Sequence, residues 1–258
     1  MAVVGARKPT PYGEAVAESL AGDLAAAGVT VVSGLARGID AAAHRGALDA
    51  GGCTLAVLGS GVDVIYPPEH GGLAQRVLDS GGAIVSQFPD GTRPQRHHFP
   101  MRNWTMAALS DAVVVVEAAQ GSGSLITADA ALSLGRDVLA VPGSVFSPLS
   151  VGCHQLLRDG AALAQNARDV LACLGRSIEV LDDPLKAPSR LGLETVAPRD
   201  GLIAHLSDTL PMNAEELARK LAVGFPEVLA RLSRLELEGI VARQGSGYVR
   251  LVRRRGTG

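Results

Sequence analysis

Residues 29–44 read VTVVSGLARGIDAAAH, and this stretch decides the fold of most of the chain. It begins with a short β-branched run, Val29–Ser33, which is typical of a strand buried on both faces. A loop of small residues follows, and an Ala-rich helical segment then extends from Gly38 to Ala50. Strand, glycine-containing loop and helix in this order form the repeating unit of a parallel α/β sheet.

The same alternation recurs over the first two thirds of the sequence. Nearly continuous apolar runs predict strands at Ala2–Val4, Val29–Ser33, Thr54–Leu58, Ala83–Ser86, Ala112–Glu117 and Asp137–Val141. Helices are predicted near Tyr12–Ala27, Gly38–Ala50, Gly71–Ser80, Arg102–Leu109, Leu125–Leu134, Val151–Arg158 and Ala167–Leu174. Thr10 followed by Pro11 suits the start of the first helix, as a side-chain cap and a first-turn proline. We therefore expect an α/β fold with an open, doubly wound, mostly parallel sheet.

The sequence changes character after residue 175. Residues 176–200 contain prolines among polar residues without sustained periodicity, which indicates a linker. Residues 201–252 then predict a small winged-helix domain, and residues 253–258 a basic tail. The predicted elements of this second domain are helices at Gly201–Ser207, Ala214–Leu221 and Pro226–Glu238 and a hairpin of Ile240–Arg243 with Tyr248–Leu251.

The third of these helices has one apolar and one charged face. Arg231 and Arg234 are expected outward, and the inward set is Val228, Leu229, Leu232, Leu235 and Leu237. A winged helix reads duplex DNA in some proteins and serves dimerisation or docking in others. Because glutamates on the same helix dilute its charge, both alternatives stay open.

Composition sets the broad class of the protein. The chain has 258 residues, 47% hydrophobic and 19% charged, enough apolar residues for a real core. Its three cysteines lack a CxxC spacing, which argues against a disulfide framework or a thiolate zinc site. No apolar run is long enough to span a bilayer, and no signal-peptide pattern opens the chain. We expect a cytoplasmic protein with no membrane contact.

Positive charge is local in this chain. The net charge of −2 argues against a generic nucleic-acid binder. Residues 201–258, however, carry nine Lys or Arg against six Asp or Glu. A second basic stretch runs from Arg93 to Arg102, with Asp90 the acidic residue nearby. Either cluster is also compatible with a solvated face.

Glycine-rich loops follow several predicted strands. They are Gly5-Ala6-Arg7-Lys8, Ser33–Asp40 (SGLARGID), Gly59-Ser60-Gly61, and Gly121-Ser122-Gly123-Ser124 just before Thr127. The carboxyl ends of parallel strands meet at one sheet edge, where helix N-termini present free N–H groups to anions. One such loop alone indicates no more than a tight turn. Together the loops predict a phosphate-binding rim, with Arg37 able to close on an anion.

Several enzyme signatures are missing. The sequence contains no G-x-G-x-x-G fingerprint, no P-loop, no G-x-S-x-G elbow and no H-E-x-x-H. Asp40 and His44, four residues apart, fit a hydrogen bond at a helix start better than catalysis. The sequence thus offers no convincing nucleophile, and we expect no cofactor and no metal.

The segment Arg93–Trp104 combines groups that suit nucleic acid. Arg96 and Arg102 are cations, Phe99 offers a ring, and Asn103 an amide that can hydrogen-bond a base edge. Because Phe99 precedes a proline, we expect it to be extended. A cationic groove with stacking rings is how single strands are held. The alternative is that Phe99 belongs to the core and the arginines are solvated.

An ordered set of motifs in residues 3–160 resembles one known family. The motifs are GARKPTPYG (5–13), SGLARGID (33–40) with Ala43-His44, AVLGSG (56–61) with Tyr66-Pro67, FPMRN (99–103), SGSLITA (122–128), and GRDV (135–138) with Val141-Pro142-Gly143. They resemble the DprA family, also called Smf, of bacterial DNA-processing proteins. The resemblance implies a Rossmann-like domain that binds single-stranded DNA without catalysis. It also implies a homodimer that protects incoming DNA and loads the RecA recombinase onto it in natural transformation.

The resemblance also suggests site residues. It implies that Arg37, Arg96 and Phe99 contact DNA and that Arg102, Asn103, Ser122, Gly123 and Ser124 line the same site. With rim residues of the loops, the expected single-stranded DNA site is Gly5, Arg7, Ser33, Gly34, Arg37, Gly38, Arg96, Phe99, Arg102, Asn103, Ser122, Gly123, Ser124 and Thr127. We expect phosphates on the amides of the Gly34–Gly38 and Gly121–Ser124 loops, and bases against Phe99 and Asn103.

The sequence departs from the family pattern in places. Trp104, Gln87 and His154 stand where an arginine, a glutamate and an asparagine are usual. The helical domain that often precedes the sheet has no counterpart, so we expect either a lineage without it or a trimmed sequence.

Two rival functions use the same kind of sheet. A phosphoribohydrolase carries P-G-G-x-G-T, and Pro142-Gly143-Ser144 fails this pattern at its third residue. A transcriptional regulator would read duplex DNA with the winged helix, and a preference for duplex DNA would favour it.

Overall fold

The computed structural model describes residues 1–175, 202–207, 211–221, 223–237, 240–244 and 247–250. The chain divides into two compact units, Met1–Leu185 and Lys186–Gly258. The linker expected at 176–200 and the tail expected at 253–258 lie outside the described residues. Each unit is described separately below.

The first unit is built on a seven-stranded sheet in the order β4-β3-β2-β1-β5-β6-β7. All neighbouring strands pair in parallel. The strands are β1 (Ala2–Val4), β2 (Val31–Ser33), β3 (Thr54–Leu58), β4 (Ala83–Ser86), β5 (Ala112–Val115), β6 (Asp137–Ala140) and β7 (Ala162–Leu163). The predicted doubly wound parallel sheet is confirmed. The sequence reading did not include β7, because two exposed residues are too few to show a periodicity.

The strand order contains one reversal of direction. From β1 the chain builds outward through β2 and β3 to β4, and it then returns to place β5 on the other side of β1. The loops that leave β1 and β5 therefore lead to opposite sides of the sheet. At such a switch point a crevice opens beyond the carboxyl ends of the strands.

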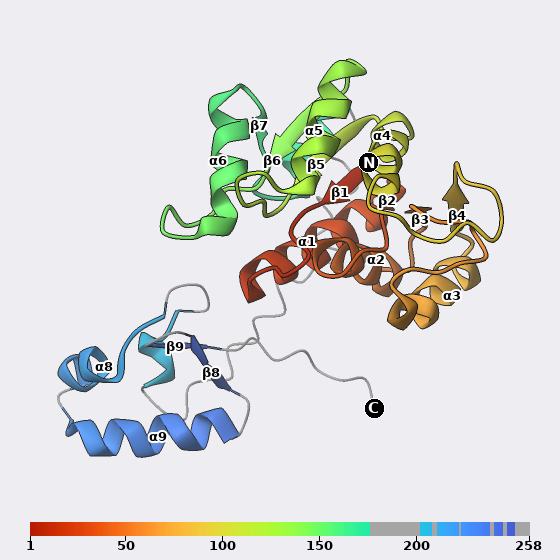
Figure 1. Ribbon diagram of the computed structural model, residues 1–258. Helices are drawn as coiled ribbons and strands as arrows, with labels where there is room; N and C mark the ends of the chain where they lie inside the picture. The colour runs from red at the N-terminus through yellow and green to blue at the C-terminus, as the bar shows by residue number, and fades with distance from the viewer. Residues whose placement is uncertain (176–201, 208–210, 222, 238–239, 245–246, 251–258) are drawn as a thin grey trace. The chain divides into compact units, whose positions relative to one another are not determined.

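Helices cover both faces of the sheet (Figure 1). Helices α1 (Pro11–Ala26), α2 (Ile39–Asp49) and α7 (Ala167–Cys173) share one apolar cluster, and α4 (His98–Ala108), α5 (Gly123–Ser133) and α6 (Val151–Arg158) share the other. Helix α3 (Gly71–Asp79) packs on β3 and β4 beside α2. Within the described ranges, no helix combines the length and apolar character that crossing a bilayer requires.

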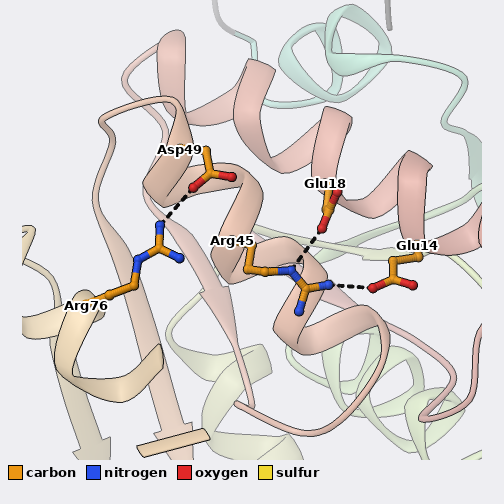
Figure 2. A network of polar contacts seen from close by, with 5 residues as sticks. All are labelled: Glu14, Glu18, Arg45, Asp49 and Arg76. Carbon is orange, nitrogen blue, oxygen red and sulfur yellow. Dashed lines mark hydrogen bonds and ion pairs between the residues drawn. The ribbon is translucent and has the colours of Figure 1, made fainter. Parts of the chain in front are cut away.

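Helices α1 and α2 approach each other closely. A Cβ at Gly46 would lie 2.0 Å from the carbonyl oxygen of Glu18, so a larger residue there would force the helices apart. Figure 2 shows ion pairs on this layer, in which Arg45 on α2 contacts Glu14 (2.6 Å) and Glu18 (2.9 Å) on α1. Arg76 on α3 pairs with Asp49 on α2 at 2.8 Å. These pairs join α1, α2 and α3 at the surface.

The first helix begins where its capping residue predicts, whereas the fourth begins earlier than predicted. The hydroxyl of Thr10 accepts from the Gly13 N–H at 3.1 Å, and Pro11 is the first residue of α1, as predicted. Helix α4, however, begins at His98 and not at Arg102, so the expectation that Phe99 is extended is wrong. Pro100 is the third helical residue, where a backbone N–H would have no intrahelical acceptor.

The second unit contains the elements of a winged helix, as predicted. Helices α8 (Ala214–Leu221) and α9 (Phe225–Leu237) precede the antiparallel strands β8 (Val241–Gln244) and β9 (Gly247–Arg250). The helix predicted at Gly201–Ser207 is, over its described residues, a 3₁₀ turn at Ile203–His205.

The core of the second unit follows the predicted apolar face of α9. Val228, Leu232 and Leu235 are buried against Leu217, Val241 and Tyr248. Leu229 is half-buried, and the side chain of Leu237 lies outside the described residues. Arg234 is exposed, and half-buried Arg231 lies 3.6 Å from Glu227.

Candidate functional site

Glycine-rich loops meet at the carboxyl edge of the sheet and line two adjoining cavities. The smaller, which we call the aromatic cavity, has a volume of 160 Å³ and is lined by Arg7, Lys8, Gly34, Ala36, Arg37, Gly59, Tyr66, Pro67, Phe99 and Arg102. The larger, the switch-point cavity, has a volume of 430 Å³ and lies beyond β1 and β5. Its lining includes Val4–Lys8, Ala36, Asp40, Phe99, Pro100, Arg102, Asn103, Met106, Ala119–Ser124, Ile126, Thr127 and Leu149. All four predicted loops thus contribute to this edge.

The loop after β2 is held by its own neighbours. The Oδ2 atom of Asp40 accepts from the N–H groups of Gly34 (3.1 Å) and Ala36 (3.4 Å). Leu35, between them, is buried with φ +56°, in the left-handed region. Two of the Gly34–Gly38 amides that were expected to bind phosphate therefore already have an acceptor within the protein.

Arg102 forms the base of both cavities and is only 4% exposed. Its Nη1 donates to the carbonyl oxygens of Gly34 and of Val57 (2.8 Å), and its Nε donates to the Oδ1 of Asn103 at 3.1 Å. A Cβ at Gly34 would lie 2.0 Å from Nη1, so only glycine leaves room for this guanidinium. Arg102 joins α4 to β2 and β3.

A buried charge pair accompanies this brace. Burial raises the pKa of Asp40, and the Arg102 charge and the Gly34 and Ala36 N–H groups oppose that rise. Burial lowers the pKa of Arg102, and the Asp40 charge opposes it. Each charge thus offsets part of the cost of burying the other.

Three residues predicted for the site form hydrogen bonds within the fold. Arg102 donates to the Gly34 and Val57 carbonyls and to Asn103. Asn103 is buried, and its Nδ2 donates to the Gly123 carbonyl at 2.9 Å while its Oδ1 accepts from Arg102. Ser33 is fully buried and donates to the Val3 carbonyl at 2.7 Å. These hydrogen bonds lie within the fold. Arg102 and Asn103 nevertheless line the cavities, as predicted, whereas Ser33 lines neither.

The N-terminus of α5 faces the switch-point cavity. Ser122 caps the helix by accepting from the Ser124 N–H at 3.4 Å, and the two hydroxyls lie 2.8 Å apart. Gly123 is exposed at the first helical position. Thr127 is fully buried, lines the cavity, and its Oγ1 has no hydrogen-bond partner in the described part of the chain. A helix N-terminus with such a hydroxyl beside it suits an anion.

The exposed cations of the rim come from the first two loops. Arg7 and Lys8 follow β1 and line both cavities. Arg37 lines the aromatic cavity, and its guanidinium pairs with Glu69 in the 3₁₀ turn Pro68–His70. The Glu69 backbone N–H and then Arg37 lower the pKa of the Glu69 carboxyl.

Other predicted residues lie at the margin. Gly5 lines the switch-point cavity, whereas Gly38, which caps α2, lines neither cavity. Arg96 and Trp104 are exposed and also line neither.

The ring of Phe99 lies between the two cavities and is half-buried. The Arg7 guanidinium carbon lies 5.0 Å from its ring centroid, within cation–π range. The Tyr66 ring lies 5.9 Å away, tilted by 42°. His98 holds the start of α4 by placing its Nδ1 3.1 Å from the Gly59 carbonyl and stacking on Phe88 at 4.1 Å.

The sequence reading omitted Tyr66 and Glu69 from the site. Both follow the Gly59-Ser60-Gly61 loop within ten residues, and Tyr66 is one of only eight aromatic residues in the chain. An aromatic residue so near a rim loop was the available signal.

Known proteins resemble the chain over both units. The model of the family described as DNA recombination-mediator protein A matches residues 1–175, and that of the DprA winged helix domain matches residues 186–247. Protein Smf of Escherichia coli is 42% identical over 255 residues, 98% of this chain and 68% of the relative's own length.

Two solved structures are similar to about two thirds of the chain. The X-ray structure of DNA processing protein A from Streptococcus pneumoniae is 43% identical with a TM-score of 0.61, covering 66% of this chain and 60% of that one. A structure of DNA processing protein A from Helicobacter pylori, described by its single-stranded DNA binding mode, is 31% identical with a TM-score of 0.61 and covers 67% of this chain and 78% of that one. By its sheet, its rim and these matches, the chain belongs to the DNA recombination-mediator protein A family, called DprA or Smf.

Proposed function

We propose that this protein binds single-stranded DNA at the carboxyl edge of its sheet and acts in natural transformation and recombination. One observation carries the proposal: Arg7, Lys8 and Arg37 surround a cavity walled by aromatic rings, beside the N-terminus of α5. The Helicobacter pylori relative, whose single-stranded DNA binding mode has been described, supports it. We propose that the protein acts by binding and not by catalysis, in the cytoplasm, where incoming strands meet the recombinase.

Phosphates and bases use different parts of this edge. The rim cations neutralise the phosphates, and the switch-point cavity receives a phosphate at the α5 N-terminus. A base reaches the ring of Phe99 only after it unstacks from the neighbouring bases. A single strand allows this, whereas a duplex resists it because the base is also paired. Two or three neutralised phosphates give a slope of log K against log salt of roughly −1.4 to −2.1, from about −0.7 per contact on single strands.

Arg37→Ala tests this assignment, with Arg76→Ala as the matched control. Each variant removes one arginine from an exposed ion pair of the first unit, but Arg76 lies in the last turn of α3 and lines neither rim cavity. We expect Arg37→Ala to weaken binding to all single-stranded sequences alike and to reduce the salt slope by about 0.7. Fluorescence anisotropy with labelled single-stranded and duplex oligonucleotides, titrated at several salt concentrations, measures both quantities.

Arg76→Ala should bind like the wild type. Equal losses in the two variants would point to a general charge effect, and a loss confined to one sequence would contradict a phosphate role. Duplex-favoured binding that ignores Arg37 would move DNA binding to the winged helix.

We further propose that the protein is a homodimer that loads the RecA recombinase. Two linked sites on one strand gain affinity through effective concentration, which suits a small number of contacts per site. Exposed Leu132 on α5, Val151 on α6 and Leu163 on the edge strand β7 offer apolar surface to a second copy. We expect light scattering to give twice the chain mass and Leu163→Asp to lower it to one. The test of loading is faster recombinase assembly on strands coated with single-strand binding protein, and an unchanged rate would reject that role.

A further inference from the structure

We propose that the segment Tyr66–His70 forms a second wall of the DNA site, in which Tyr66 stacks on a base and Glu69 competes with DNA phosphates for Arg37. The inference rests on the proposed function and deepens it. No residue of this segment was among those expected to contact DNA. Tyr66 and Glu69, however, lie next to two residues that were, Phe99 and Arg37.

Tyr66 is the accessible ring of the aromatic cavity. It is 40% exposed, and its ring centroid lies 5.9 Å from that of half-buried Phe99. Phe99 already has the Arg7 guanidinium over its ring and packs against Gly59, where an added Cβ would lie 3.1 Å from its Cδ1. A base that enters the 160 Å³ cavity therefore meets the exposed Tyr66 ring as well as Phe99. Stacking on a ring tolerates any base, as a sequence-independent site requires.

The segment is held in position before DNA arrives. The His70 Nδ1 lies 2.8 Å from the Leu35 carbonyl oxygen, and because a carbonyl only accepts, Nδ1 carries the proton. Leu35 is buried in the loop after β2, whose amides are held by Asp40. The Tyr66 wall is thus attached to the same loop that carries Arg37. An ordered wall loses little conformational entropy when a base stacks on it.

Glu69 occupies the donors that a phosphate would use. Both the Nε and the Nη2 of Arg37 lie against the Oε1 of Glu69. Guanidinium groups bind carboxylate and phosphate oxygens through the same planar set of N–H donors. The side chains of Arg37 and Glu69 are 61% and 49% exposed, so a strand can reach the pair from solvent. DNA that contacts Arg37 must first displace Glu69.

The two residues therefore predict effects of opposite sign. We expect Tyr66→Leu, which keeps an apolar side chain without a ring, to weaken single-stranded DNA binding about fivefold or more with an unchanged salt slope. Tyr66→Phe should stay within about twofold of the wild type. We expect Glu69→Gln to strengthen binding about two- to fivefold at low salt, a gain that shrinks as the salt concentration rises.

Asp49→Asn is the matched control for Glu69→Gln. It removes the same charge from an exposed ion pair of the same unit, at the last residue of α2, away from both rim cavities. Anisotropy with labelled oligothymidylate at several salt concentrations gives affinity and slope for each variant, and thermal unfolding checks that each is folded. Asp49→Asn should match the wild type in both affinity and slope.

A second measurement uses the unaltered protein and does not depend on any variant folding. Ultraviolet cross-linking to oligonucleotides that contain 5-bromodeoxyuridine, followed by peptide mapping, should place a cross-link at Tyr66, since stacked aromatic rings couple efficiently to this base. Cross-links that consistently omit Tyr66, or Tyr66→Leu binding like the wild type, would overturn the base wall. Glu69→Gln binding no tighter than Asp49→Asn would overturn the competition. Absence of single-stranded DNA binding by the wild type would instead reject the proposed function.

Discussion

Replacement of Arg102 by methionine will destabilise the first unit by about 3–5 kcal/mol, the usual consequence of removing one of two buried opposite charges that compensate each other. The variant leaves the Asp40 carboxylate buried without its opposing charge. It also leaves the Gly34 and Val57 carbonyls without their donor. Urea unfolding followed by circular dichroism measures the change as a shift in midpoint at constant slope.

A double variant tests the cause of that loss. In Arg102→Met with Asp40→Asn no charge remains buried at this point, so part of the lost stability should return. Arg76→Met, which removes an exposed arginine, should cost less than about 1 kcal/mol. A loss of less than about 1 kcal/mol for Arg102→Met would show that the guanidinium is not the brace described above.

Acidification will destabilise the protein through His44. Burial, and then the His70 and Arg102 charges, lower the pKa of His44 to about 3 from its ordinary 6.5. Below pH 6.5, His44 binds a proton in the unfolded chain but not in the folded chain. The contribution of His44 to the free energy of unfolding is therefore complete above pH 6.5 and is lost as the pH drops toward 3. For a shift of this size, His44 accounts for about 2 kcal/mol of lost stability by about pH 5.

His44 donates a hydrogen bond from its Nδ1 atom. Thr54 Oγ1 donates to the Val31 carbonyl at 2.8 Å, so it must accept from His44 Nδ1, also at 2.8 Å. The variant His44→Asn keeps a hydrogen-bond donor where Nδ1 lies, in the form of a side-chain amide that does not titrate. His44→Asn should therefore lose about 2 kcal/mol less than the wild type between neutral pH and about pH 5. Parallel pH dependences in the two proteins, measured by urea unfolding at each pH, would contradict this account.

The contacts of His44 also show that residue spacing does not predict hydrogen-bond partners. Asp40 and His44 are four residues apart on α2, which predicts a hydrogen bond at the helix start without naming its partner. The structure gives each a different partner: Asp40 accepts from Gly34 and Ala36, and His44 contacts Thr54. Spacing places two side chains on one face of a helix, but the residues that pack against that face decide what each one bonds.

The strands and most helices were readable because their signals are local. Parallel strands covered on both faces must be continuously apolar, and Thr10 with Pro11 marks the start of α1 within two residues. The start of α4 was not readable. The residue before a proline usually avoids helical geometry. At Phe99 this preference yields to the contacts of His98 with Gly59 and Phe88.

In the site, too, local signals were predictable and contacts between distant segments were not. The glycine-rich loops meet at one edge because parallel strands all end there, so their order along the chain was enough to predict the rim. The sequence marked Ser33, Arg102 and Asn103 as polar and near the rim, but the fold turns them inward, where each donates to a backbone carbonyl group. It leaves Arg7, Lys8, Arg37 and Tyr66 at the surface of the cavities. Residue type states what a side chain can bond, whereas burial and the nearest partner, set by segments distant in the chain, determine which of those bonds remain available to DNA.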